Sequence, residues 1–597
     1  MTAAAPSGEG VVVDSPRYRL ELDGRGLRAT LTSPAGDRWA VLRPLAALDR
    51  PDGVDETVSV ASPRISRDGA ATTITVERRS TVWDRAGVTL HCGEEAIEVR
   101  AWVAGSGRLA DVHLLGGRSL IPGAPTGFLP SGSSFRTLFS PNPGDPARLV
   151  RAAGETAVVG VSGDEEPGRG HWFFTPAPLY LALTTAEGVS EPDDDVAGGW
   201  LGVAIAAPVG DLTFVQLTYQ PADRAFSLRL DYEGHTRVDG EFTAPAVVLT
   251  PGMPDPYTGL RAHRADLVRR GAAPEPRPRA APRWWSAPIF CGWGAQCHLA
   301  ATTGRRAAEL ATQENYDRFL EHLEGHDVVP GTVVVDDKWQ EAYGTCVPDP
   351  SKWPDLKGWI AGRHARGQHV LLWWKAWDAE GLPDDLCVRG PGGRPVVVDP
   401  SNPVAREALA EAVTRVLAPE GLDADGLKID FTARTPSGRA LSYRGPAWGV
   451  ALLHELLAVV YAAAKAAKPD ALVITHTPHP GFVDVTDMIR LNDMLRLKDP
   501  GPVPAVVPQM RYRANVVRAA CPELLVETDD WCVPDRETWR AYQTIKHELG
   551  VPSLYYATHF DRTGEELALE DYEALRRLAE LAGGAPAPAA SGARRRG

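Results

Sequence analysis

The 597-residue sequence lacks any dense basic stretch except the three arginines near its end, Arg594 to Arg596. The net charge is −14, so no basic stripe is present to neutralise phosphates, and nucleic acid is not an expected partner. The opening residues, MTAAAPSGEG, lack a basic segment followed by an apolar run, and no later stretch comes near twenty apolar residues. We therefore expect no secretion signal, no membrane span and a cytoplasmic location.

Cysteine is scarce and unpatterned. There are seven cysteines, an odd number, and no two of them form a CxxC pair. We expect reduced thiols and no metal or cofactor. Cys291 and Cys297 are close enough in sequence for a disulfide, although spacing alone does not bring their Cβ atoms together.

The first 270 residues predict an antiparallel β-sandwich domain. Hydrophobic side chains alternate with polar ones, as at Leu20 and Leu22 and at Ile74 and Val76, and no long helical stripe interrupts this pattern before Tyr257. Clusters of Gly and Pro separate the strands. The Pro-rich segment that follows predicts an extended linker over residues 271–284.

After the linker, short apolar strands alternate with helical stretches, which predicts a (β/α)₈ TIM barrel over residues 285–582 and a flexible tail over 583–597. Asn402 and Pro403 make a cap and first turn for one of its helices, and residues 450–468 predict another. The eight expected strands are APIFCGW, TVVVDD, HVLLWW, DGLKID, ALVITH, DMIRLND, LLVETDD and PSLYYATH.

Polar side chains follow many of these strands, at the ends where TIM barrels place their chemistry. Acids follow the second, fourth, sixth and seventh strands, and tryptophans stand beside them. Sugar sites combine flat aromatic rings with carboxylates, because sugars have apolar C–H faces and many hydroxyls. The rim therefore favours a sugar or oligosaccharide substrate.

Asp430 and Asp493 are the expected catalytic pair. Cleavage of a glycosidic bond needs one carboxylate at the anomeric carbon and one carboxylic acid at the leaving oxygen. Lys428 and Asp430 are two residues apart on one strand, so both point into the barrel mouth, and the cation favours the ionised nucleophile. Asp493 ends the sixth strand, where apolar surroundings and other acids raise the pKa of a carboxyl.

These motifs resemble the clan of melibiase-type α-galactosidases and retaining α-glucosidases, glycoside hydrolase families 36, 27 and 31. The resemblance rests on VVVDDKWQ, on LKID and on acids after the fourth and sixth strands. It implies that Asp336 and Asp337 bind sugar hydroxyls, that Asp430 is the nucleophile and that Asp493 is the acid/base. It also implies a β-sandwich before the barrel.

The sequence departs from this clan in three places, so the sugar is left open. Lysine replaces glycine in DDKW, KIDF lacks the aromatic residue between Lys and Asp, and THTPHP replaces a loop rich in Cys, Ser and Gly. The residues expected to bind the sugar are Asp336, Asp337, Trp339, Trp374, Lys428, Arg490, Asp529, Asp530, Trp531 and His476.

Three alternatives remain open at this stage. Asp529 follows an apolar strand and is the second candidate for the acid/base. A metal-dependent barrel enzyme could draw ligands from His476, His479, Asp493, Asp529, Asp530 and His559. A carbohydrate-binding relative without turnover would keep the same barrel. The sequence also leaves open whether the chain forms a homo-oligomer.

Overall fold

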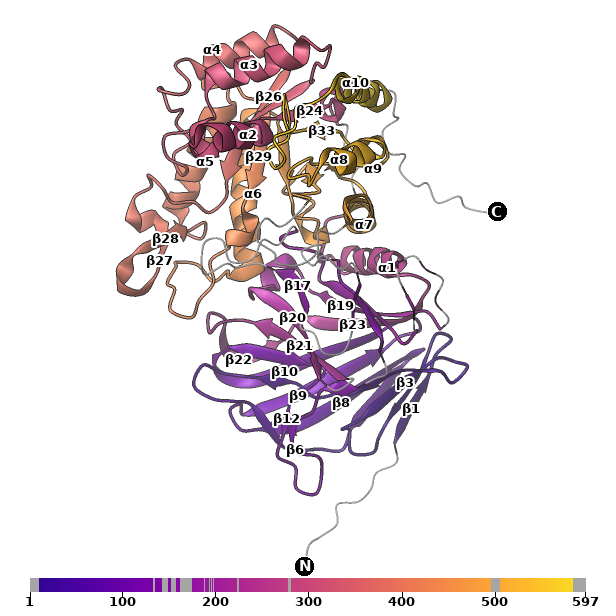
Figure 1. The fold of residues 1–597 in the computed structure, drawn as a ribbon. Helices are drawn as coiled ribbons and strands as arrows, with labels where there is room; N and C mark the ends of the chain where they lie inside the picture. Colours follow the sequence, from indigo (N-terminus) through magenta and orange to yellow (C-terminus); the bar gives the residue numbers. More distant parts are fainter. Residues whose placement is uncertain are drawn as a thin grey trace, which may run out of the picture.

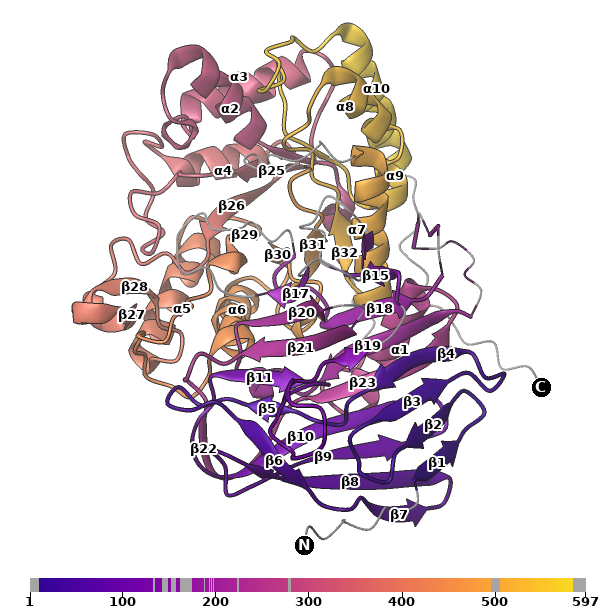
Figure 2. The ribbon, with the colours of Figure 1, turned by 60° about the horizontal axis from the view of Figure 1, so that its bottom comes forward.

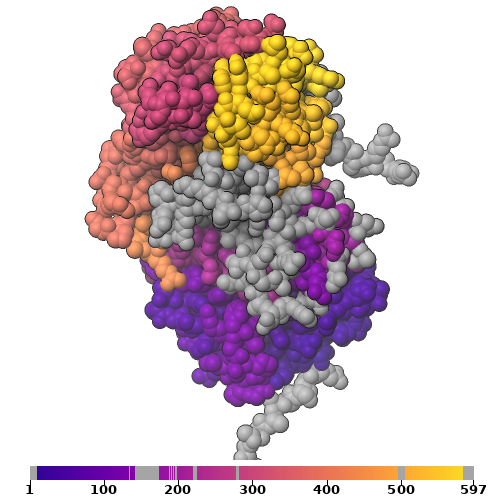
Figure 3. Space-filling model, viewed as in Figure 1, coloured from indigo at the N-terminus to yellow at the C-terminus, as the bar shows by residue number. Residues whose placement is uncertain are grey.

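The computed structural model describes residues 10–583 except 133–134, 142–148, 152–156, 162–173, 187, 190, 193, 195, 197, 223–224, 277–280 and 495–504. Part of the expected linker and nearly all of the expected tail lie outside the described residues. The chain forms a β-rich amino-terminal part and a carboxyl-terminal α/β part that sits on one side of it (Figure 1). The same division is visible on the surface (Figure 3).

The amino-terminal part consists of two large sheets built almost entirely from antiparallel pairs. The expected alternation is present in β8 (Ala71–Ser80), where every second side chain from Thr72 to Arg78 is buried. The ten-stranded sheet consists of β1 (Val11–Asp14), β2 (Arg19–Leu22), β3 (Ala29–Thr32), β4 (Arg38–Leu42), β5 (Ala47–Leu48), β11 (Asp111–Leu114), β14 (Ser131–Gly132), β17 (Ala157–Val161), β20 (Gln216–Ala222) and β21 (Ala225–Asp231).

The thirteen-stranded sheet contains β8, and strands of both sheets make up the lower half of the molecule in Figure 2, below the barrel. One of its pairs, β6 with β12, is parallel. Its other strands are β6 (Glu56–Val60), β7 (Arg64–Asp68), β9 (Arg85–Cys92), β10 (Ile97–Arg108), β12 (Arg118–Ser119), β13 (Gly127–Phe128), β15 (Thr137–Phe139), β16 (Leu149–Arg151), β18 (Tyr180–Thr184), β19 (Trp200–Ala206), β22 (Arg237–Thr243) and β23 (Ala246–Met253).

One helix, α1 (Pro256–Arg269), ends the β-rich part. Asp255 caps it by accepting a hydrogen bond from Thr258 N, and Pro256 fills its first turn, where no amide hydrogen is needed. It packs between β18, β19 and β23 on one side and a barrel helix on the other. The expected linker is not extended to its end, because a 3₁₀ helix begins at Arg283 and buries Trp285.

The carboxyl-terminal part is an eight-stranded parallel barrel, and each expected strand is present. The strands follow sequence order around the sheet, and the last strand pairs with the first. A parallel bridge from Glu527, at the end of the seventh strand, to Val551, just before the eighth, lies where the sheet closes. The barrel strands are β24 (Ile289–Cys291), β25 (Thr332–Val335), β26 (His369–Lys375), β29 (Gly426–Asp430), β30 (Leu472–Thr475), β31 (Met488–Arg490), β32 (Leu525–Glu527) and β33 (Ser553–Leu554). A hairpin, β27 (Cys387–Arg389) with β28 (Pro395–Val398), extends one loop.

Helices surround the barrel (Figure 1). As expected, Asn402 caps one of them and accepts a hydrogen bond from Val404 N. They are α2 (Trp293–Thr303), α3 (Gln313–Glu324), α4 (Leu356–His364), α5 (Pro403–Leu417), α6 (Gly449–Ala467), α7 (Val506–Ala520), α8 (Arg536–Gln543), α9 (Lys546–Leu549) and α10 (Leu569–Gly583).

Helix α6 is long and apolar enough to cross a membrane when judged by length and composition alone. Most of its apolar side chains are buried, and the helix packs against α5 in the barrel wall. A buried core helix of a barrel has the same composition, so the hydropathy of α6 follows from its place in the fold.

The two parts of the chain are joined by hydrogen bonds near the ends of β29 and β30. Glu233 accepts from Ser437 Oγ at 2.6 Å and from Trp448 Nε1 at 3.1 Å. The backbone of Thr175 binds two barrel residues, because its N–H donates to His476 O at 2.9 Å and its carbonyl accepts from Thr432 Oγ1 at 3.0 Å. The β-rich part therefore contacts the rim at which the candidate site lies.

Candidate active site

Strand β29 directs Lys428 and Asp430 to the same side, as the period of two predicts. The Lys428 ammonium is buried and donates to Asp336 Oδ2 at 2.7 Å and to Cys291 Sγ at 3.3 Å. Cys291 in turn donates to the same carboxylate oxygen at 3.0 Å. The ends of β24, β25 and β29 thus meet in one buried polar cluster beneath Asp430.

Asp430 accepts hydrogen bonds on both carboxylate oxygens. Arg490 Nη2 and the Phe431 N–H bind Oδ1 at 3.0 and 2.9 Å, and Trp373 Nε1 binds Oδ2 at 3.2 Å. Burial raises the pKa of this carboxyl, but the charges of Arg490, His476 and Lys428 and the backbone N–H outweigh burial and hold the pKa below its ordinary value. Asp430 is therefore an anion at neutral pH.

Asp493 has the opposite electrostatic environment. Burial raises the pKa of Asp493 to about 7, and the neighbouring carboxylates of Asp529 and Asp430 act in the same direction. Arg490 opposes this rise through Nη1, which lies 3.3 Å from Asp493 Oδ1. Two carboxyl groups bound to one guanidinium therefore have pKa values on opposite sides of the ordinary range, the arrangement needed for one base and one acid.

Exposure separates these two carboxylates from the other acids of the cluster. The side chains of Asp430 and Asp493 are 23% and 24% exposed, whereas that of Asp529 is fully buried. The Arg490 and Asp336 side chains are each 3% exposed. Within this cluster, Asp430 and Asp493 are thus the acids open to a ligand entering the mouth.

The turn that carries Asp493 is fixed by a buried cation. Arg513 on α7 donates through Nη1 to Leu491 O at 2.8 Å, to Asn492 O at 2.9 Å and to Asp493 O at 2.6 Å. Asn492 has a left-handed backbone with φ of 68°, and its side chain accepts from Asp493 N at 3.0 Å. Asn is one of the few residue types that adopt this conformation readily.

Asp337 lies at the rim in a cluster with aromatic and cationic side chains. Its Oδ1 accepts from Tyr343 OH at 2.6 Å, and burial raises the pKa of Asp337 to about 6. Lys375 and Lys338 place their ammonium groups 4.0 and 4.1 Å from the centre of the Tyr343 ring. A carboxyl and a phenol at this position can bind sugar hydroxyls.

The structure places several predicted binding residues outside the cluster around Asp430 and Asp493. Asp530 is fully buried and accepts from Lys546, Gln543 and Trp539 of the outer helices. Trp374 follows Trp373 on β26 and so lies on the opposite face of that strand, near Cys346.

Trp339, Trp531 and His476 are also buried, and their side chains form hydrogen bonds to other residues of the protein. Trp339 Nε1 donates to Trp373 O at 2.8 Å, and Trp531 Nε1 donates to Asp561 Oδ2 at 3.1 Å. His476 is hydrogen-bonded to Thr432 Oγ1 through Nε2, and its Nδ1 lies 3.9 Å from Asp430 Oδ1. Through these hydrogen bonds the three side chains position residues that adjoin the site.

Four residues that belong to the site were not among the predicted site residues. They are Cys291, Tyr343, Trp373 and Lys375. The register of β26 against β29 identifies two of them, because Trp373 pairs with Lys428 and Lys375 pairs with Asp430. Of the six residues of the metal-dependent alternative, Asp493 and Asp529 meet at Arg490, but no group of three or more His, Cys, Asp or Glu that could hold a metal ion occurs among the described residues.

No protein-family model matches the chain, and no curated protein matches it either. Solved structures do match. An α-galactosidase from Thermus thermophilus in complex with stachyose is 16% identical, with a TM-score of 0.51, and the match covers 87% of this chain and 99% of that one. A GH31 family sulfoquinovosidase from E. rectale, in complex with an aza-sugar inhibitor, is 11% identical, with a TM-score of 0.56 and coverage of 96% and 82%.

A third match is the GH36 α-galactosidase AgaA from Geobacillus stearothermophilus. It is 12% identical, with a TM-score of 0.53, and the match covers 96% of this chain and 86% of that one. At such low identity the likeness shows the fold alone. The chain therefore has the architecture of these α-glycosidases, with a β-sandwich followed by a TIM barrel.

Proposed function

We propose that the protein is a retaining α-glycoside hydrolase in which Asp430 is the nucleophile and Asp493 is the acid/base. The observation that carries this proposal is a pair of partly exposed carboxyl groups bound to one guanidinium, that of Asp430 with a lowered pKa and that of Asp493 with a raised pKa. The fold shared with α-galactosidases and a sulfoquinovosidase supports it.

The reaction follows as a double displacement. Asp430 Oδ attacks the anomeric carbon while protonated Asp493 gives its proton to the departing glycosidic oxygen, so the C–O bond breaks as the glycosyl ester forms. Asp493, now a carboxylate, takes a proton from water, and that water attacks the anomeric carbon and releases Asp430. Retaining enzymes hold the two carboxyls about 5 to 5.5 Å apart, which favours side chains that share a single partner such as Arg490.

Arg490 and Lys428 have distinct parts in this scheme. Arg490 holds Asp430 ionised and fixes its orientation, and it remains paired with Asp529 while Asp430 changes from anion to ester. Lys428 neutralises Asp336 below the site. Asp336 is 3% exposed and held by Lys428, so of these two acids it is Asp337, near Asp430, whose carboxylate would bind a sugar hydroxyl.

The test is hydrolysis of aryl α-galactoside, α-glucoside and α-sulfoquinovoside by wild type and by Asp430→Asn. We expect one of these sugars to be cleaved with retained configuration, seen by proton NMR of the first anomer released. Asp430→Asn should abolish turnover, with a loss on the order of 10⁴-fold or more.

Asp239→Asn is the matched control, because the Asp239 side chain is 72% exposed on β22, and its activity should equal wild type. Inversion of configuration, or normal turnover by Asp430→Asn, would overturn the assignment. Tight sugar binding with no hydrolysis of any substrate would instead identify a carbohydrate-binding protein without turnover.

A further inference from the structure

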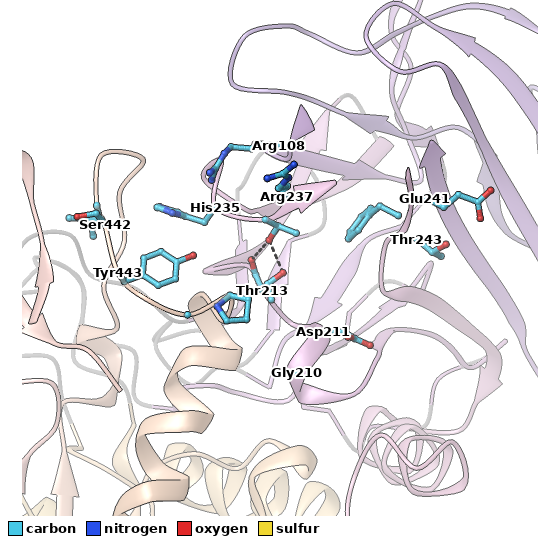
Figure 4. Close-up of a pocket in the computed structure, with 15 residues that line it drawn as sticks. Arg108, Gly210, Asp211, Thr213, His235, Arg237, Glu241, Thr243, Ser442 and Tyr443 are labelled. Atoms are coloured by element: carbon cyan, nitrogen blue, oxygen red, sulfur yellow. Dashed lines mark hydrogen bonds between the residues drawn. The ribbon is translucent and has the colours of Figure 1, made fainter. Parts of the chain in front are cut away.

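A cavity of about 710 Å³ lies between the two parts of the chain, apart from the cluster around Asp430. One wall comes from the β-rich part: the end of β10, both ends of β22 with the two residues before it, and residues 210–213, which include Asp211. The other wall comes from residues 441–446, in the loop that follows strand β29 (Figure 4). A cavity of this size is in the range that holds a small ligand.

Arg108 and Arg237 stand at one side of this cavity. They are directly opposed in the antiparallel register of β10 and β22, so their side chains leave the same face of the sheet. Like charges in that position destabilise a strand pair. An anion bound between the two guanidinium groups would remove this repulsion.

The protein itself neutralises these arginines poorly. Arg108 Nη1 donates to the Gly234 carbonyl at 3.1 Å, and no carboxylate in the described part of the chain forms an ion pair with Arg108. Arg237 pairs with Asp239 at 3.2 Å, but both side chains are at least 70% exposed, so solvent screens that pair. Glu241 also lines the cavity, on the side away from Arg108 and Tyr443 (Figure 4).

An aromatic platform adjoins the arginines. Tyr443 is half-buried, lines the cavity and stacks on the fully buried Trp448, with ring centres 4.8 Å apart. His235 packs against Trp448 at 3.8 Å and donates through Nε2 to Gly438 O at 2.9 Å. Burial lowers the pKa of His235, so this ring is neutral at pH 7 and the positive charge comes from the arginines.

We infer that this cavity is an accessory binding site for an anionic saccharide, a sugar ring on Tyr443 with its carboxylate, sulfonate or phosphate between Arg108 and Arg237. The aromatic surface suits the C–H face of a pyranose, and planar guanidinium groups bind oxyanions in a bidentate manner. The hydroxyls of Thr213, Thr236 and Ser442 line the same cavity and can bind ring hydroxyls. The inference stands independently of the chemistry at Asp430.

The experiment is calorimetric titration of the full chain with three probes: a digalacturonate, a neutral digalactoside and inorganic phosphate. We expect the digalacturonate to bind, and phosphate and the neutral sugar to bind at least tenfold more weakly. All titrations use the Asp430→Asn variant, so that hydrolysis does not consume the sugars.

Arg108→Ala and Tyr443→Ala should each weaken digalacturonate binding at least tenfold, and Arg67→Ala, an exposed arginine on β7, should leave it unchanged. Arg108→Ala should not lower the melting temperature, since it removes a repulsion. Introduced into the wild-type protein, which keeps Asp430, it should leave the rate of aryl glycoside hydrolysis unchanged. Undiminished binding by Arg108→Ala, equal binding of phosphate, or equal binding of the neutral sugar would overturn the inference.

Discussion

Asp430 and Asp493 bind different nitrogens of the same guanidinium, Asp430 Oδ1 to Arg490 Nη2 at 3.0 Å and Asp493 Oδ1 to Arg490 Nη1 at 3.3 Å. One cation therefore orients two acids whose pKa values are shifted in opposite directions. Asp529 completes the group at 2.9 Å from Nη1 and is wholly buried, so a substrate does not reach it. This burial favours Asp493 over Asp529 as the acid/base.

Asp493→Asn should lose activity in proportion to the need for protonation. General acid catalysis contributes about 10² to 10⁴-fold, and glycosides with poor leaving groups depend on it most. We expect a loss in that range for an alkyl glycoside and a much smaller loss in the first step for an activated aryl glycoside. Steady-state and burst kinetics on both substrates measure the difference. Equal losses on the two would contradict the assignment.

The pH profile of kcat/KM should fall on the alkaline side. Asp493 has a raised pKa of about 7, so it carries its proton below that pH and loses it as the pH rises through 7. Asp430 has a lowered pKa and stays ionised across this window. Hydrolysis of a poor substrate should therefore decline above about pH 7, and Asp493→Asn should remove this decline. An unchanged alkaline limb in that variant would assign it to another group.

Trp373 and Trp374 form a matched pair for substitution. Trp373→Phe removes the indole N–H that donates to Asp430 Oδ2 at 3.2 Å, and we expect kcat to fall by about tenfold, the effect of one lost hydrogen bond to a charged group. Trp374→Phe changes the other face of β26, and kcat should be preserved. Melting temperatures of both variants separate lost packing from lost catalysis. A larger kcat effect from Trp374→Phe would show that the two roles are reversed.

Arg490→Ala should weaken the fold as well as the chemistry. It leaves the buried Asp529 carboxylate without its cation, and breaking a buried pair in this way costs about 3 to 5 kcal/mol. Urea unfolding measures the change in the free energy of unfolding. Arg305→Ala is the control, because its pairing with Glu309 is exposed and should contribute little. Equal free energies of unfolding for the two variants would show that the fold does not need Arg490 to neutralise the carboxylates of Asp430, Asp493 and Asp529.

The sequence was sufficient to predict the eight barrel strands and to place Asp430 and Asp493 at the ends of two of them, because each strand is a short apolar run and the acids follow directly. It was insufficient wherever a choice between neighbours depended on which face of a strand points inward. Trp374 was chosen over Trp373, and Asp530 was grouped with Asp529, although the structure turns Asp530 towards Lys546. A slip of one residue reverses the face, and pairing register is a tertiary property.

Cys291 was expected to be a reduced thiol, with a disulfide to Cys297 as the other possibility, and no part in the site was predicted for it. All seven cysteines are described and are free thiols, and the Cys291 thiol bonds to Lys428 and Asp336. Its place could have been inferred from its position at the end of the first barrel strand. The cavity at Arg108 could not be predicted in this way, because residues more than 300 positions apart in sequence form it and no local sequence pattern connects them.

The backbone of Thr175 reaches from the β-rich part to the loops after β29 and β30, where it binds Thr432 and His476 beside Asp430. The barrel alone therefore does not contain every group that supports the candidate site. Shortening the gene to residues 285–583 would leave the His476 carbonyl without its donor and the Thr432 hydroxyl, which also bonds the His476 imidazole, without its acceptor. The β-rich part and the barrel should therefore be kept together when the protein is shortened, recombined or engineered.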